Sequence, residues 1–177
     1  SNLSDETEIR VEVIRYTMAG RESWSVIDNT PTGTHATVGG ASELLIDDPS
    51  FNSCIALVKP GVTSGGVQGP PAGTPMSFTI DMGAATTFDH VMITHSNYIT
   101  SISYRMKQAT FYGSDDNVTY TQIEAAKTVS TSGTAPIRVA FDASHSCRYI
   151  KAEIVPYSTA SYDPLLYIRD LQVGTTS

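Results

Sequence analysis

Two adjacent carboxylate pairs, Asp47-Asp48 and Asp115-Asp116, are the residues of this chain most directly suited to acid/base chemistry. A general acid and a general base must face each other across a substrate, but neighbouring residues of an extended segment point to opposite faces. Neither pair is therefore an acid/base dyad by itself. The histidines also lack the i, i+2 or i, i+4 spacing of a zinc site. They are His35, His90, His95 and His145.

The local patterns that accompany familiar catalytic sites are absent from the sequence. There is no GxSxG, HExxH, GxxxxGK or GxGxxG, the patterns of serine hydrolases, zinc proteases and nucleotide-binding loops. A hydrolase would need two carboxylates that the fold brings together from distant segments. The sequence therefore predicts a protein that is not an enzyme.

A second use of the first acidic pair is calcium binding. Calcium takes six to eight oxygen ligands, many of them from a tight turn, and Asp47, Asp48 and Ser50 lie in one turn-forming stretch with Pro49. Asp170 is a further carboxylate near the end of the chain. From the residues alone two interpretations stay open: these groups hold a structural calcium, or Asp47 caps a turn and Asp170 is solvated.

The elements that would position these residues are extended strands. Phe78, Ile80 and Met82 share one face of a predicted strand, and Gly83 allows the chain to turn before a second strand over 88–94. Turn-forming residues over 113–117 then separate two further strand-like runs, which predicts a hairpin. The sequence therefore predicts an all-β fold.

The rest of the chain extends this pattern. We expect one helical turn over 42–46, a long exposed loop over 59–75, and strands over 137–141, 150–154 and 165–173. About eight core strands with extra N-terminal strands predict a jelly-roll β-sandwich. We expect a single domain, in which residues 1–30 form a strand or arm packed on the sandwich of residues 31–177.

Composition excludes several classes of partner. The net charge of −7 disfavours nucleic acid, and no apolar run approaches the ~20 residues that a membrane span requires. Cys54 and Cys147 carry no metal-ligand spacing, so we expect two free thiols more readily than a disulfide.

Six segments in a fixed order resemble the discoidin family, also called the coagulation-factor type C domain. They are LLIDDPS, SFTIDMG, FDHVMITHS, ATFYGSDDNVTYTQI, CRYIKAEIV and YIRDLQV, between about residues 42 and 174. This family has a galactose-binding-like β-sandwich and includes bacterial carbohydrate-binding modules. The resemblance implies a structural calcium held by Asp47, Asp48, Ser50 and Asp170. The chain departs from the family pattern at Ser77 and Tyr120, where tryptophan is usual.

The resemblance also implies a function and a place for the ligand. It implies a non-catalytic carbohydrate-binding module that is part of an exported, glycan-capturing bacterial protein with further domains. Such a protein would lie at the cell surface or in the periplasm, and a lipid anchor could be attached through an N-terminal segment that has been removed. The alternative is a protein-interaction or spacer sandwich that has lost sugar binding. A galactose-type glycan would be held by loops at one end of the sandwich. The implied ligand residues are His95, Asn97, Tyr98, Arg105, Tyr157 and Tyr162.

Overall fold

In this computed structural model most of the described residues are in β-strands. The structure describes residues 12–27, 35–36, 44–47, 54–95, 101–129, 135–158 and 163–177. The strands are β1 (Tyr16–Met18), β2 (Ser25–Ile27), β3 (His35–Ala36), β4 (Ile55–Val58), β5 (Thr63–Ser64), β6 (Val67–Gln68), β7 (Met76–His95), β8 (Met106–Ser114), β9 (Thr121–Gln122), β10 (Lys127–Thr128), β11 (Ile137–Pro156) and β12 (Leu165–Thr176). Two short helices, α1 (Leu44–Asp47) and the 3-10 helix η1 (Ile102–Tyr104), complete the described elements.

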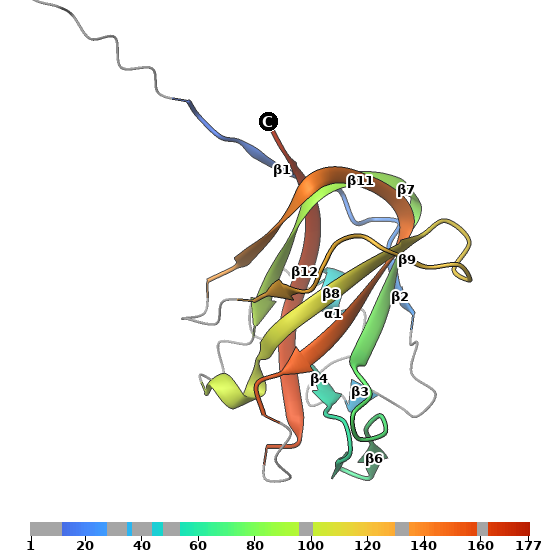
Figure 1. The fold of residues 1–177 in the computed structure, drawn as a ribbon, viewed down its shortest axis with the longest axis vertical. Coiled ribbons are helices and arrows are strands. Elements are labelled where there is room, and N and C mark those ends of the chain that lie inside the picture. Colours follow the sequence, from blue (N-terminus) through green and yellow to red (C-terminus); the bar gives the residue numbers. More distant parts are fainter. Residues whose placement is uncertain are drawn as a thin grey trace, which may run out of the picture.

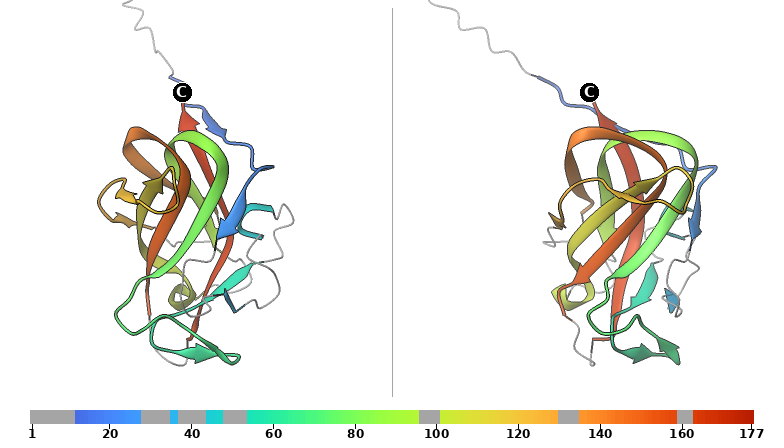
Figure 2. Two further views of the ribbon diagram at one scale, coloured as in Figure 1. Left: turned by 90° about the vertical axis from the view of Figure 1, so that its right-hand side faces the viewer. Right: turned by 45° about the vertical axis from the view of Figure 1, so that its right-hand side comes forward.

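Two 20-residue strands, β7 and β11, build both layers of the sandwich. They pair antiparallel along nearly their whole length and arch over together at one end of the molecule (Figures 1 and 2). Beyond the arch, the first half of β7 lies beside β2 and the second half of β11 lies beside β8. The second half of β7 pairs with β12, which continues to β4. One folded sheet thus supplies two layers, and we call its arched side the bend end.

The arch forms where the β7–β11 ladder is irregular. Register shifts separate Ala140 from His145 and Cys147 from Tyr149, and bulges of this kind increase local bending and twist. On β7, Gly83 has a φ of 79°, and a Cβ there would lie 2.8 Å from Ser23 Oγ. Both the backbone angle and the space therefore require glycine at this position.

The core lies between the two layers. Phe78 and Phe111 come from one layer and Val91 and Leu171 from the other, and all four are buried in one cluster. Trp24, just before β2, joins the same cluster. The apolar residues that alternate with polar ones in the sequence therefore lie on the inward face of each strand.

The structure corrects three sequence predictions and confirms others. The two strands expected around Gly83 are one bent strand, β7, and those expected over 137–141 and 150–154 are one strand, β11. The loop expected over 59–75 contains the small β5–β6 hairpin. The all-β sandwich is confirmed, as is the hairpin turn between β8 and β9. The helix α1 (Leu44–Asp47) overlaps the helical turn expected over 42–46. Neither Cys54 nor Cys147 is in a disulfide.

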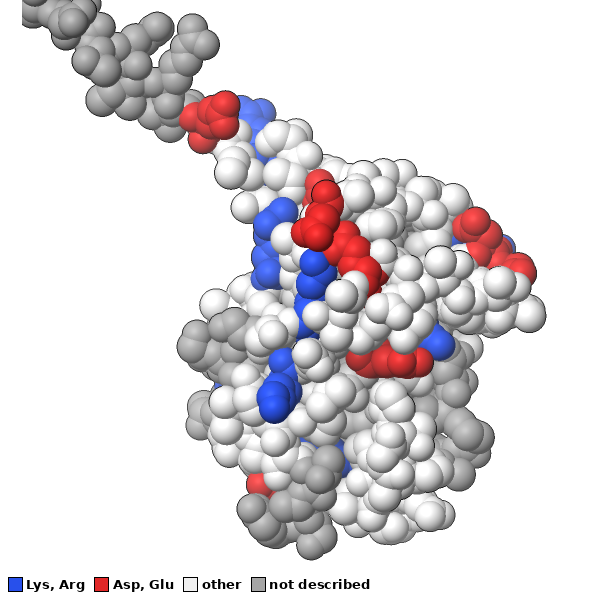
Figure 3. Space-filling model, viewed as in Figure 1, with Lys and Arg blue, Asp and Glu red and all other residues white. Residues whose placement is uncertain are grey.

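The surface carries charges of both signs. On the face shown in Figure 3, Lys and Arg side chains lie next to Asp and Glu side chains, and few charged side chains are visible in the lower part of the described surface. Arg148, for example, donates to both carboxylate oxygens of Asp81 at 2.9 Å. Among the described residues, no helix is long and apolar enough to cross a membrane.

Candidate functional site

Three of the predicted ligand residues, His95, Arg105 and Tyr157, lie at the end of the sandwich opposite the arch, which we call the open end. Here β7 ends at His95, η1 leads into β8, and β11 ends at Pro156. Register places Pro156 beside Met106 and Ile168 of β12 beside His95. Segments that are distant in the sequence therefore meet at this end (Figure 1).

His95 is part of the buried framework of this end. Its side chain is 2% exposed, and its Nε2 accepts a hydrogen bond from the Met106 backbone N–H at 3.2 Å. Burial, with a contribution from the nearby Arg105 charge, lowers the pKa of His95 to about 4. The expected basic ligand residue is thus a neutral imidazole that orders the start of β8.

Because His95 is neutral in the folded protein, stability depends on pH. Between about pH 6.5 and about pH 4, His95 is protonated in the unfolded chain but neutral in the folded chain. The unfolded state therefore binds more protons, and the free energy of unfolding decreases as pH falls. The loss from this residue reaches up to about 3 kcal/mol across that interval. His95→Gln keeps an acceptor for Met106 and cannot titrate. Denaturant unfolding at about pH 7 and about pH 5 should therefore show a flatter pH dependence for the variant; equal slopes would contradict this assignment.

Arg105 and Tyr157 lie side by side at this end. Arg105 is buried, and its carbonyl accepts a hydrogen bond from the Tyr157 backbone N–H at 3.2 Å. Tyr157 follows the end of β11, and its side chain is 37% exposed. The structure therefore brings together three of the predicted ligand residues, and Tyr157 presents the accessible aromatic surface among them.

The other three predicted ligand residues, Asn97, Tyr98 and Tyr162, lie outside the described residues. They follow β7 and precede β12 in the sequence. Their assignment to the ligand site stays a prediction.

A charged and aromatic cluster beside η1 is not among the predicted ligand residues. The Lys59 ammonium donates to the Ser103 carbonyl and lies 5.7 Å from the centre of the Tyr104 ring. A hydrogen bond to Asp163 raises the pKa of the Tyr104 hydroxyl, and Tyr167 lies 5.6 Å from Tyr104 between ring centres. Burial lowers the pKa of Lys59, although the Asp163 charge opposes this effect. The sequence feature that could have indicated this cluster is Lys59, a lysine directly after the apolar run IALV.

The Asp170 carboxylate, expected as a calcium ligand, contacts protein groups in this structure. One carboxylate oxygen forms an ion pair with Arg21, and the other accepts a hydrogen bond from Gln172 Nε2 at 2.9 Å. The same Arg21 nitrogen donates to the carbonyls of Leu171 at 3.1 Å and Leu45 at 3.4 Å. A guanidinium thus provides the positive charge between α1 and β12.

The remaining expected calcium ligands lie where the structure does not describe side chains. Asp47 ends α1, while Asp48 and Ser50 lie outside the described residues. Among the described residues, no group of three His, Cys, Asp or Glu side chains could hold a metal ion. Calcium therefore stays a prediction.

Comparison with known proteins identifies the fold and the family. The model of the F5/8 type C domain matches residues 55–164, and no curated protein matches the chain. Among solved structures, the C-terminal domain of a chitobiase from Bacteroides fragilis is 18% identical, with a TM-score of 0.67, and the match covers 91% of this chain and 99% of that one.

Two similar structures contain sugars. The family 32 carbohydrate-binding module of NanJ from Clostridium perfringens, solved with galactose, has 16% identity, a TM-score of 0.63, and coverage of 90% and 99% of the two chains. Another Clostridium perfringens module, solved with GalNAc-β-1,3-galactose, has 14% identity, a TM-score of 0.66, and coverage of 89% and 99%. Because the family model covers more than half of the sequence, the chain belongs to the F5/8 type C domain family.

Proposed function

We propose that this chain is a non-catalytic carbohydrate-binding module that holds a glycan at its open end. Family membership and the shared fold of modules solved with galactose and GalNAc-β-1,3-galactose support this function. Those modules are covered over 99% of their length, so the resemblance extends to whole binding domains. A galactose-type sugar is the first ligand to test.

The observation on the chain itself that carries the proposal is Tyr157. Its exposed ring follows the end of β11, next to the backbone of Arg105. An aromatic face accepts the C–H groups of a pyranose, while nearby polar groups fix its hydroxyls. Behind Tyr157, the hydrogen bond between Met106 and His95 joins β8 to β7. The backbone that carries Tyr157 is therefore held by hydrogen bonds, which favours binding because less conformational entropy is lost when the ligand binds.

Tyr157→Ala should weaken glycan affinity at least about tenfold, which corresponds to about 1.4 kcal/mol, because the stacking surface is lost. Isothermal titration calorimetry with galactose and with GalNAc-β-1,3-galactose measures the effect. Thermal unfolding of the same variant should remain close to that of the unmodified chain, because Tyr157 is exposed.

Tyr16→Ala is the matched control. Tyr16 is also an exposed tyrosine, but it lies on β1, which pairs with the end of β12 at the far side of the molecule. Its replacement should leave glycan affinity unchanged. Unchanged affinity in Tyr157→Ala would remove this ring from the binding site, and equal losses in both variants would show that the effect is not local.

The alternative, an interaction or spacer domain without sugar binding, is favoured by one observation. Val13 and Ile14, just before β1, are large, exposed apolar side chains, and such surfaces mark protein contacts. Under this alternative no glycan binds, and a truncation before Tyr16 abolishes association with neighbouring domains.

We further propose that the chain belongs to an exported bacterial protein with other domains. The structures it resembles come from Bacteroides fragilis and Clostridium perfringens, and one of them is the C-terminal domain of a chitobiase. Attachment through an N-terminal lipid belongs to the same proposal. Fractionation of cells that produce the full-length protein tests both parts.

A further inference from the structure

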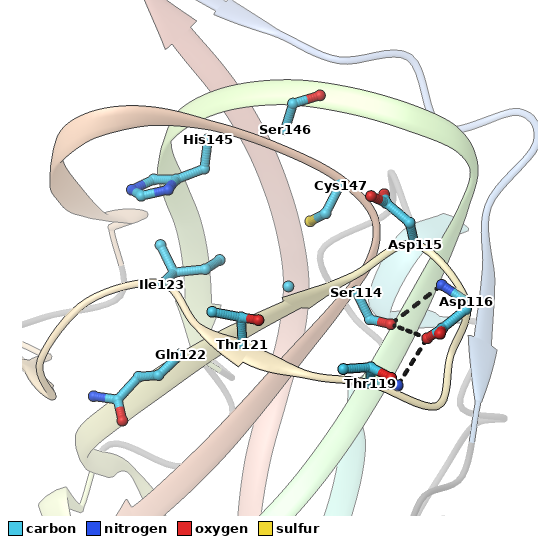
Figure 4. A pocket seen from close by; sticks show the side chains of 11 residues that line it. Ser114, Asp115, Asp116, Thr119, Thr121, Gln122, Ile123, His145, Ser146 and Cys147 are labelled. Carbon is cyan, nitrogen blue, oxygen red and sulfur yellow. Dashed lines mark hydrogen bonds between the residues drawn. The ribbon is translucent and has the colours of Figure 1, made fainter.

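The bend end contains a cavity of about 420 Å³ that the proposed sugar site does not use. One wall is the β8–β9 hairpin, with Thr121 and Ile123, and the other is the bend of β11, with His145 and Cys147 (Figure 4). Its volume lies within the range of about 300–1,000 Å³ that small-molecule sites occupy. The remaining lining residues are Gly113, Ser114, Asp115, Asp116, Thr119, Gln122 and Ser146.

The cavity forms where β8 and β11 separate, next to Ser114 and Tyr149. β8 pairs with β11 only from Ser114 and Tyr149 onward, so the preceding part of β11 has no β8 residue beside it. There β11 continues along the arch with β7, while the chain after Ser114 turns back as β9. The space between the two segments stays open above Gly113, where a Cβ would lie 3.1 Å from Cys147 Sγ.

The hairpin wall is held in one conformation by its own turn. Asp116 Oδ1 accepts hydrogen bonds from the backbone N–H groups of Thr119 at 2.7 Å and Val118 at 2.8 Å. Ser114 Oγ accepts one from the Asn117 N–H at 3.0 Å and donates to Asp116 at 2.9 Å. The backbone hydrogen bonds from Thr119 and Val118 lower the pKa of Asp116 to about 2. The turn is therefore preformed and carries a full negative charge.

The opposite wall is tied to the hairpin through Glu124. Its carboxylate accepts a hydrogen bond from the Asp142 N–H at 2.6 Å, lies 3.3 Å from His145 Nε2 and pairs with Lys127 at 2.6 Å. Burial raises the pKa of Glu124, but the hydrogen bonds from Lys127, His145 and the backbone outweigh it and bring the pKa to about 2. Because both walls are held by these hydrogen bonds, the cavity is preformed, which reduces the entropy lost when a ligand binds.

The lining combines an apolar floor with a polar, negatively charged rim. Ile123, Gly113 and buried Cys147 supply apolar surface, while Thr121, Ser146 and Asp115 supply hydroxyl and carboxylate groups. Arg148 and Lys127, two cations next to residues of the cavity walls, pair with Asp81 and Glu124. A ligand with C–H groups for the floor and hydroxyl donors for the carboxylates matches this lining, whereas an anionic ligand is repelled.

We propose that this cavity is a second saccharide site, selective for neutral or amino hexoses over uronic acids. This inference rests on the proposed function, because it assigns a further site to a sugar-binding chain. The two sites lie at opposite ends of the sandwich, so one glycan chain or two neighbouring glycans can be held at once. Two weak sites that act together give a higher overall affinity than either alone.

An NMR titration of the ¹⁵N-labelled chain with galactose, glucosamine and galacturonate tests the proposal. Galactose and glucosamine should shift the amide signals of Gly113, Thr121 and Ser146, and galacturonate should shift them much less. Asp115→Asn keeps an acceptor for the Arg148 N–H, which Asp115 Oδ1 now holds at 3.2 Å. Because Asp116 also lines the cavity and stays charged, this variant should reduce the preference for galactose over galacturonate without abolishing it.

Thr121→Trp should fill the cavity and weaken the binding measured at these signals at least about tenfold. Thr121 is exposed and opposite Gly113 in register, so the change does not disturb the core. Val118→Trp is the matched control, because Val118 lies in the same turn, is 81% exposed and does not line the cavity. This control and Tyr157→Ala should leave the cavity signals as they are in the unmodified chain.

The outcomes separate the two proposals. Shifts confined to the amides of Arg105 and Tyr157 would overturn the second site and leave the proposed function standing. Cavity signals that still shift in Thr121→Trp would also overturn the second site. Shifts at neither end with any of the three sugars would overturn this inference and count against the proposed function as well.

Discussion

Replacement of Phe88 with alanine should lower the free energy of unfolding by about 3–5 kcal/mol, the usual cost of deleting a fully buried aromatic ring. Phe88 is fully buried and lies on β7 opposite His145 of β11. Its ring centre is 5.9 Å from that of Phe141 and 6.4 Å from that of His145. Its removal leaves a hole where β7 and β11 arch over, so both layers lose support. Chemical denaturation followed by fluorescence or circular dichroism measures the change.

The matched control for Phe88 is Val118→Ala, which shortens an exposed apolar side chain and should change stability by less than about 0.5 kcal/mol. A loss below about 1 kcal/mol in Phe88→Ala would contradict the packing of the bend. If the variant does not fold at all, Phe88→Leu keeps most of the volume and should show a smaller, measurable loss.

Arg21→Ala should destabilise the protein by about 2 kcal/mol, less than for a fully buried ion pair because water screens the charges. The side chains of Arg21 and Asp170 are 20% and 16% exposed. The substitution leaves the Asp170 carboxylate without its cation and removes hydrogen bonds to the carbonyls of Leu45 and Leu171. Thermal unfolding measures the loss. Arg138→Ala is the matched control, because Arg138 is exposed and its guanidinium lies over the Tyr16 ring.

The same melting experiment tests calcium. If Arg21 supplies the positive charge that the family pattern assigns to a metal, the melting temperature of the unmodified chain should be equal in calcium and in a chelator. A midpoint that rises with calcium would instead support a metal at Asp48 and Ser50, outside the described residues. In Arg21→Ala, a new dependence on calcium would show that the oxygen atoms around Asp170 accept either cation.

The sequence was sufficient to predict the class of fold because burial follows the strand period. The alternation of Phe78, Ile80 and Met82 with polar residues predicts an inward face, and these three residues are buried in the structure. The continuity of β7 could not be predicted, since Gly83 is equally compatible with a turn and with a bent strand. Tertiary pairing with β11 decides between them. Arg21 was missed as the partner of Asp170 because 149 positions separate the two residues.

For the candidate site, the sequence indicated the end of the sandwich but not the state of each side chain. His95 was expected to contact ligand because the family resemblance places a basic ligand residue at this position; in the structure it is buried and accepts a hydrogen bond from Met106. Its burial depends on β12 and β8, which no local pattern reveals. The cavity at the bend end could not be predicted either. One wall is the β8–β9 hairpin, and the other is the part of β11 that lies between its two register shifts.

The central claim is that this member of the F5/8 type C family binds carbohydrate. Isothermal titration calorimetry of the whole chain, with galactosides and N-acetylhexosamines in the presence and absence of calcium, tests it most directly. The account predicts saturable binding of at least one galactose-type glycan, weakened by Tyr157→Ala. Flat titrations with every sugar, under both conditions, would contradict it.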